Sequence, residues 1–162
     1  MNANTRKLHD LGQRLWLDNI TRDLLDRGTL ARYIADLSVT GLTSNPTIFE
    51  HAIGSGASYD DAIQKLAARG LSEEGIFFEL ALVDLTRAAD LFRPAFDASD
   101  GVDGWVSLEV SPLLAGDRAG TIRAAAQPHA RAARPNFFIK IPGTPQGLPA
   151  IEQSIFDGCR ST

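Results

Sequence analysis

Lys140 is the residue whose type and position most directly suggest chemistry. It lies in an apolar run from Phe137 to Ile141 that is followed by Pro142 and Gly143. A fully buried strand reads as continuous apolar residues, and an unpartnered ammonium group in such a strand is costly. A lysine driven towards its neutral form is a nucleophile that forms a Schiff base with a carbonyl carbon. The sequence therefore makes Lys140 a candidate for imine-forming catalysis, with a structural or edge-strand lysine as the alternative.

Three other polar residues, Asp18, Asn45 and Glu109, lie in or at the ends of predicted strands. Taken alone, Asp18 is explained as part of a turn or helix cap, and Asn45 with Pro46 as an ordinary turn dipeptide. Glu109 is harder to explain in this way, because Leu and Val flank it within a strand. Their joint occurrence with Lys140 at matching strand ends favours one shared functional site.

The elements that must position these residues alternate between strands and helices. The predicted strands cover residues 14–18, 41–45, 105–111 and 137–141. The predicted helices cover residues 4–12, 21–37 with a break at Gly28, a stretch capped by Ser58 and Asp61, 72–98, 117–133 and 145–157. The helix over 72–98 has a core stripe with steps of four and three, formed by Phe78, Leu82, Leu85, Ala89 and Phe92. This alternation predicts a parallel sheet with right-handed crossovers.

The period-two alternation within the strands distinguishes two kinds of α/β fold. Each strand has one apolar side and places a polar group on the other side near its carboxyl end: Asp18, Asn45, Glu109 and Lys140. A doubly wound sheet would bury both faces under helices, whereas a barrel gives these side chains a shared lumen with function at the carboxyl mouth. The alternation therefore favours a barrel over a doubly wound sheet.

Composition excludes several other classes. The 162 residues are 44% hydrophobic and 22% charged, which is typical of a globular domain. A net charge of −4 without a basic run argues against a nucleic-acid partner. No apolar stretch approaches the ~20 residues of a membrane span, residues 1–10 lack a secretory core, and the single Cys159 suits a reducing compartment. We expect a cytoplasmic protein without membrane partners.

Four segments resemble successive motifs of the transaldolase family, in the family's order and spacing. They are 15–19 (LWLDN), 41–49 (GLTSNPTIF), 106–112 (VSLEVSP) and 138–144 (FIKIPGT). The resemblance implies a (β/α)8 TIM-barrel fold that uses class I aldolase chemistry in the pentose phosphate pathway, on sugar-phosphate substrates. A dihydroxyacetone unit would pass from sedoheptulose 7-phosphate to glyceraldehyde 3-phosphate. It implies no metal and no organic cofactor.

The same resemblance assigns roles to the polar residues. Lys140 matches the Schiff-base lysine, Asp18 the residue that exchanges a proton with the substrate hydroxyl, and Glu109 a residue that acts through water. Asn45 matches a hydrogen-bonding partner of the bound dihydroxyacetone. Attack at neutral pH needs an uncharged amine, and we expect desolvation by Phe138 and the barrel wall to favour that form.

Length conflicts with a complete barrel. Such barrels have about 250 residues, with 200 as a lower bound, whereas this chain has 162 and shows about four βα units. We expect one domain over residues 1–162, an N-terminal, C-terminally truncated half of a transaldolase barrel. Its activity alone would be weak or absent, and its unpaired outer strands invite self-association. Pro128 is expected to kink or split the helix before the fourth strand.

Three alternatives remain open at this point. The first is a lyase similar to fructose 6-phosphate aldolase, which uses like chemistry on a shorter chain. The helical leader before Asp18 and the long insertion at 72–98 favour transaldolase over it. The second is a non-catalytic half-barrel remnant, and the third is the front part of a transaldolase–isomerase fusion.

Overall fold

A four-stranded parallel sheet forms the centre of the molecule. The structure, a computed structural model, describes residues 2–55 and 57–161, so Met1, Gly56 and Thr162 lie outside the described residues. The strands are β1 (Leu15–Leu17), β2 (Val39–Thr43), β3 (Trp105–Glu109) and β4 (Phe137–Lys140), and their spatial order is β1-β2-β3-β4. Strand order that follows sequence order is the arrangement of a barrel wall, because a doubly wound sheet reverses direction at a switch point. The predicted α/β fold with about four βα units is confirmed.

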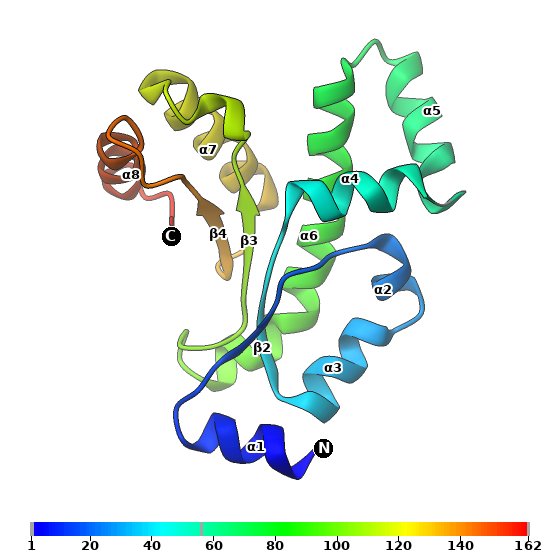
Figure 1. The fold of residues 1–162 in the computed structure, drawn as a ribbon, viewed down its shortest axis with the longest axis vertical. Coiled ribbons are helices and arrows are strands. Elements are labelled where there is room, and N and C mark those ends of the chain that lie inside the picture. The colour runs from blue at the N-terminus through cyan, green and yellow to red at the C-terminus, as the bar shows by residue number, and fades with distance from the viewer. Residues whose placement is uncertain (1, 56, 162) are drawn as a thin grey trace.

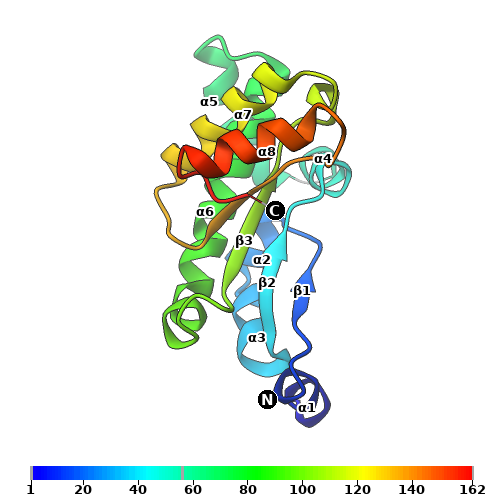
Figure 2. The ribbon, with the colours of Figure 1, turned by 90° about the vertical axis from the view of Figure 1, so that its left-hand side faces the viewer.

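Helices cover the sheet and extend beyond both of its ends. They are α1 (Ala3–Asp10), α2 (Arg22–Asp26), α3 (Thr29–Leu37), α4 (Pro46–Gly54), α5 (Asp60–Ala68), α6 (Glu73–Ala98), α7 (Arg118–Ala132) and α8 (Gly147–Phe156), with short 3₁₀ turns η1 (Ala57–Tyr59) and η2 (Pro112–Leu114). Figures 1 and 2 show α1 at the end where the strands begin and α5 beyond the end where they finish. The hairpin of α5 and the first half of α6 therefore projects on the side of the carboxyl ends of the strands.

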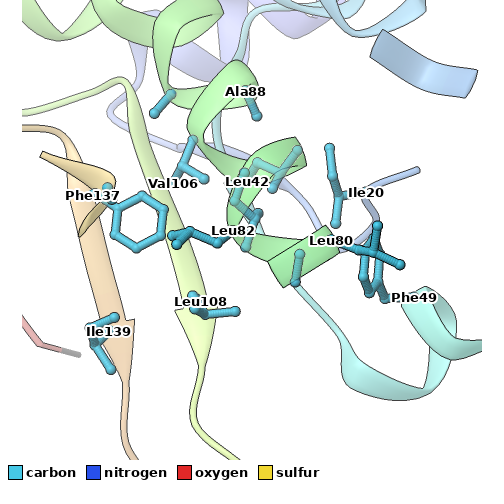
Figure 3. Close-up of a cluster of buried hydrophobic side chains, with 14 of the residues drawn as sticks. Ile20, Leu42, Phe49, Leu80, Leu82, Ala88, Val106, Leu108, Phe137 and Ile139 are labelled. Carbon is cyan, nitrogen blue, oxygen red and sulfur yellow. The ribbon is translucent and has the colours of Figure 1, made fainter. Parts of the chain in front are cut away.

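The apolar face of the sheet packs against α6. Figure 3 shows Leu42, Val106 and Phe137 on neighbouring strands together with Leu82 and Ala88 of the helix, and all of them are buried. Burying a side chain of the Val, Leu or Phe type contributes about 1.5–3 kcal/mol. Burial of these side chains therefore determines which face of the sheet packs against α6 and which face points away from it.

The helix boundaries follow local chemistry that the sequence partly reveals. Thr21 caps α2 by accepting the Leu24 amide at 3.2 Å, and Gly28 separates α2 from α3 at φ +66°. Ser72 caps α6 in the same way by accepting the Gly75 amide at 3.2 Å. The predicted cap at Thr21, the break at Gly28 and the start of the long helix are confirmed.

One helix was not predicted, one predicted helix cap is wrong, and the split that Pro128 was expected to cause, as one of two outcomes, does not occur. Helix α4 was not predicted, although Asn45 at its N-cap and Pro46 at its first position are a recognised start signal. Ser58 does not cap α5; its hydroxyl donates to Asp23 at 2.6 Å, and α5 has no side-chain cap. Pro128 does not split α7, which continues through it as one helix.

A buried charge cluster ties α2 and η1 to α6. Asp84 is fully buried and accepts from Arg22 at 3.0 and 3.1 Å and from the Tyr59 hydroxyl at 3.0 Å. The Tyr59 oxygen in turn accepts the backbone N–H of Arg22 at 2.7 Å. Desolvation raises the pKa of Asp84 against the opposing pull of Arg22, and desolvation together with the Asp84 charge raises the pKa of Tyr59. We call Arg22, Tyr59 and Asp84 the buried cluster.

The two outer strands are open at their edges. Within the described residues β1 pairs only with β2, and the outer side of β4 makes a single parallel bridge from Ile139 to Ser161. In that bridge the Ile139 amide donates to the Arg160 carbonyl at 2.9 Å. The sheet is therefore an open wall and not a closed barrel.

Candidate active site

The strand register arranges the face opposite α6, here called the lumen face, into rows. Trp16, Gly41 and Trp105 are aligned in the first row. Thr43, Ser107 and Phe138 form the second row, and Glu109 and Lys140 form the third, nearest the carboxyl ends. Parallel pairing thus brings residues that are far apart in sequence onto one surface, as the alternation predicted.

The first two rows form an aromatic and hydroxyl floor. The rings of Trp105 and Phe138 stack with centroids 4.0 Å apart and an interplanar angle of 6°. Trp16 lies directly over Gly41, where an added Cβ would come 2.4 Å from the indole ring. Only glycine leaves room for that ring. Ser107 donates to the hydroxyl of Thr43 at 2.9 Å, so both hydroxyls lie on the lumen face.

Lys140 and Glu109 form the chemical centre of the third row. The Lys140 Nζ lies 3.2 Å from the Glu109 Oε2, with side-chain exposures of 47% and 23%. The backbone N–H of Glu109 donates to the Ser44 hydroxyl at 3.2 Å, and the Val110 N–H donates to the Lys140 carbonyl at 3.1 Å. An amine and a carboxylate in direct contact can exchange a proton.

The predicted desolvation of Lys140 is wrong for the residues that the structure describes. The Phe138 ring is engaged with Trp105 in the stack described above, and almost half of the Lys140 side chain is exposed. The reason is geometric, because four strands build one wall and leave the space opposite it open.

Asp18 and Asn45 lie at the same end of the sheet without a described contact to Lys140. Asp18 is exposed and follows the last residue of β1, at the edge of the sheet opposite β4. Asn45 lies two residues beyond β2, and its Oδ1 accepts the amides of Thr47 and Ile48 at 3.1 and 3.4 Å as the cap of α4. Asn45 is therefore a helix cap and not the ordinary turn residue of the alternative explanation, and its Oδ1 is engaged by the start of α4.

The loop after Lys140 is held by residues that the sequence reasoning missed. Thr144 donates to the Ala115 carbonyl at 2.6 Å and accepts the Gly147 amide at 2.9 Å. An added Cβ at Gly147 would lie 1.9 Å from the Pro142 carbonyl oxygen, so this turn requires glycine. These contacts join the loops after β3 and β4 and so fix the positions of Glu109 and Lys140. A hydroxyl residue shortly after a strand end was the available signal.

Over residues 2–55 and 57–161, no group of three or more His, Cys, Asp or Glu side chains is placed to hold a metal ion. Across the same residues, none of the helices combines the length and the apolar character needed to cross a bilayer.

The fold and the site together define a class: an open segment of a parallel (β/α) barrel with a lysine–carboxylate pair at the carboxyl ends of adjacent strands. Residues 15–162 match the family model described as Transaldolase/Fructose-6-phosphate aldolase, so the chain belongs to this family.

Several curated relatives support the same assignment. A transaldolase of Thermobifida fusca is 45% identical over 98% of this chain and 43% of its own length. One from Acidothermus cellulolyticus is 47% identical over 94% of this chain and 41% of its own length, and one from Thiobacillus denitrificans is 44% identical over 91% and 41%. The chain thus spans less than half the length of these relatives.

Proposed function

We propose that this chain carries the Schiff-base residues of a transaldolase, which moves a dihydroxyacetone unit from sedoheptulose 7-phosphate to glyceraldehyde 3-phosphate. The observation that carries the proposal is the 3.2 Å contact between Lys140 and Glu109 at aligned positions of β3 and β4. The names of the relatives favour transaldolase over other Schiff-base enzymes.

In the proposed reaction, imine formation uses Lys140 and Glu109. The neutral amine attacks the ketose carbonyl carbon, and a carbon–nitrogen bond forms as the carbonyl oxygen takes up a proton. Glu109, acting through a water molecule, supplies the proton with which the carbinolamine hydroxyl leaves as water. The protonated imine then draws electrons from the neighbouring carbon–carbon bond.

Carbon–carbon cleavage and re-formation use Asp18 and Asn45. Asp18 accepts the proton of the substrate hydroxyl, the bond breaks, its electron pair neutralises the imine as an enamine, and an aldehyde leaves. The enamine then attacks the acceptor aldehyde, Asp18 returns the proton, and water releases the product from Lys140. Asn45 holds the bound dihydroxyacetone through its amide.

The 162 residues alone are expected to have weak or no transaldolase activity. Lys140 is 47% exposed, so these residues alone do not shield the reacting amine from water. Asp18 lies at the far edge of the sheet from Lys140, so a closed site needs groups on the open side.

Covalent trapping tests the proposal. The chain has only three lysines, Lys7, Lys65 and Lys140, so borohydride reduction with fructose 6-phosphate gives a clear peptide map by mass spectrometry. The chain is mixed with the C-terminal part of the Thermobifida fusca relative, to shield the site. We expect labelling at Lys140, loss of labelling in Lys140→Ala, and retention in the matched variant Lys65→Ala. Equal labelling after Lys140→Ala contradicts the proposal.

A lyase similar to fructose 6-phosphate aldolase is the second candidate, because the matching family model includes that activity. Helix α1 and the long α6 are the observations that favour transaldolase. Measuring transfer to glyceraldehyde 3-phosphate against simple cleavage in the same mixture separates the two.

Self-association through open edges is a further part of the proposal. The outer side of β1 is unpaired within the described residues, and Leu148, Ile155 and Phe156 of α8 are 57–85% exposed. We propose that residues 1–162 behave as one domain that works in the cytoplasm without nucleic-acid or membrane partners and associates at high concentration. Sedimentation velocity that shows only monomer at all concentrations contradicts the association.

A further inference from the structure

The net charge of the chain is concentrated in one segment. Residues 46–79 contain six acidic and two basic side chains and so account for the whole net charge of −4. The remaining residues contain equal numbers of acidic and basic side chains. This segment comprises α4, α5 and the start of α6, at the upper right of Figure 1.

An apolar cavity of about 430 Å³ lies where these three helices meet. Its walls are Pro46 and Ile53 of α4, Ile63 of α5, and Ile76, Phe77 and Leu80 of α6. All of these except the buried Leu80 are half-buried, so apolar surface remains accessible in the cavity. The volume falls within the range of about 300–1,000 Å³ that is typical of ligand pockets.

Three carboxylates border this cavity and form no ion pair with the described residues. Glu50, Glu73 and Glu74 line the cavity and are exposed. The ion pairs found among the described residues include none of the three, whereas the nearby Glu79 pairs with Arg131 at 2.6 Å. The α6 dipole stabilises Glu73 and Glu74 in its first turn, but it does not explain Glu50 at the middle of α4.

We propose that this groove, lined by residues 46–53, 63 and 73–80, binds a basic amphipathic helix of a partner protein. Pro46 and Ile53 are seven positions apart, as are Glu73 and Leu80, which corresponds to about 10 Å along each helix axis. The apolar anchors of a docked helix at i, i+4 and i+7 span the same length. Its apolar stripe would occupy the cavity, and flanking Lys or Arg side chains would meet Glu50, Glu73 and Glu74. Charge complementarity selects a basic partner and disfavours an acidic one.

The groove is separate from Lys140 and Glu109, so the inference does not depend on the proposed function. Pro46 nevertheless follows Asn45 directly, and both belong to the start of α4. A helix docked on α4 would therefore contact the element whose cap is a proposed substrate-binding residue.

Fluorescence anisotropy tests the inference with the full 162-residue chain. The probe is a labelled peptide of about 18 residues with Leu at i, i+4 and i+7 and Lys at the flanking positions, long enough to form a helix. We expect saturable binding that weakens as salt rises, with a gain of helical circular dichroism. The triple variant Glu50→Gln, Glu73→Gln, Glu74→Gln should raise the Kd about tenfold, equivalent to ~1.4 kcal/mol.

A charge-matched control removes three carboxylates elsewhere. Asp97→Asn, Asp100→Asn and Glu152→Gln together change the net charge equally and should leave the Kd within about twofold. A second variant, Ile76→Ser, should weaken binding through the apolar wall, with its fold checked by circular dichroism.

Several outcomes would overturn the inference. Equal binding of a peptide with Glu in place of Lys would show that charge does not select the partner. An unchanged Kd in the Glu50, Glu73 and Glu74 variant would place binding elsewhere. Failure of the peptide to bind, together with a dimer in sedimentation that Ile76→Ser dissociates, would assign the groove to a second copy of the chain.

Discussion

Two clusters of charged residues in this protein differ in almost every physical respect. In the buried cluster, Asp84 is fully buried, accepts three hydrogen bonds and has no open side. The pair of Lys140 and Glu109 is exposed by 47% and 23% and makes one direct contact. A saturated buried cluster holds helices together, whereas a partly exposed pair has hydrogen-bonding capacity left for a substrate. Burial and saturation thus separate a structural cluster from a candidate catalytic one.

The largest expected effect comes from breaking the buried cluster. Asp84→Ala removes the carboxylate that pairs with the Arg22 guanidinium and the acceptor of the Tyr59 hydroxyl proton, which should cost about 3–5 kcal/mol of unfolding free energy. Urea denaturation measures the loss. The control is Asp97→Ala on the same helix, which breaks an exposed pair with Arg93 and should cost under about 1 kcal/mol. Similar losses for both variants would refute the distinction.

Removing the Tyr59 hydroxyl tests whether its hydrogen bonds in the buried cluster contribute to stability. Tyr59→Phe leaves the Arg22 backbone N–H and one Asp84 oxygen without their partner, at a cost of about 1–3 kcal/mol. Thermal unfolding should show a lower Tm. The only other tyrosine is Tyr33, which is half-buried on α3, and Tyr33→Phe is the matched control. A Tm that falls equally in both variants contradicts the role given to the Tyr59 hydroxyl.

Substitution of Lys140 should have the opposite effect to substitution of Asp84: a small change in stability and a loss of covalent trapping. Because its pair is partly exposed, Lys140→Met should change stability by no more than about 1 kcal/mol, as measured by urea denaturation. Borohydride trapping should nevertheless be lost, because the variant lacks the amine proposed as the nucleophile. Lys65→Met should preserve both properties. A loss of several kcal/mol in Lys140→Met would place this residue with the structural charges.

Acid titration should distinguish the carboxylates whose pKa is lowered, Glu79 and Asp90, from Asp84, whose pKa is raised. This is the smallest of the expected effects. Hydrogen bonds from Arg131 and Arg134 lower the pKa of Glu79 and of Asp90, so their stabilisation is present above the ordinary values of about 4.3 and 3.9. It is lost as pH falls through the lower folded values, at about 0.2–1 kcal/mol for each pair. The pKa of Asp84 is raised, so its effect on stability has the opposite sign. The stabilisation that Asp84 contributes is present at low pH and is lost as pH rises through the pKa of the folded state.

Urea denaturation between pH 2 and 7 measures these linked changes. The double variant Glu79→Gln, Asp90→Asn should lose less stability on acidification than the unmodified chain. Asp84→Asn should instead remove the part of the profile in which stability decreases as pH rises. Profiles that stay parallel to that of the unmodified chain would contradict both assignments.

Much of the fold was predictable because its signals are local. Gly28 interrupts a helix through its own positive φ, and Ser72 caps α6 three residues before Gly75. The lumen face followed from strict alternation in β3 and β4, which have only two sides. The start of α4 was missed because Asn45 and Pro46 also signal a turn, and the choice between turn and helix depends on the apolar residues that follow.

The buried cluster could not be found by the same reasoning. Arg22, Tyr59 and Asp84 belong to three elements, and no spacing along the chain joins them. Asp84 lies between buried residues of α6, which was the only available signal. The exposure of Lys140 was also misjudged, since desolvation depends on atoms across the open side of the sheet and not on the flanking Phe138.

The sequence by itself determined the four strands and most of the helices between them, the polar face that holds Glu109 and Lys140, and the family resemblance, because alternation and motifs are properties of neighbouring residues. Only the tertiary structure decided the 3.2 Å contact of Lys140 with Glu109, its exposure, and the placement of Asp18 on the opposite edge. Distances and solvent access depend on how separate elements pack together, which residue order along one strand does not specify.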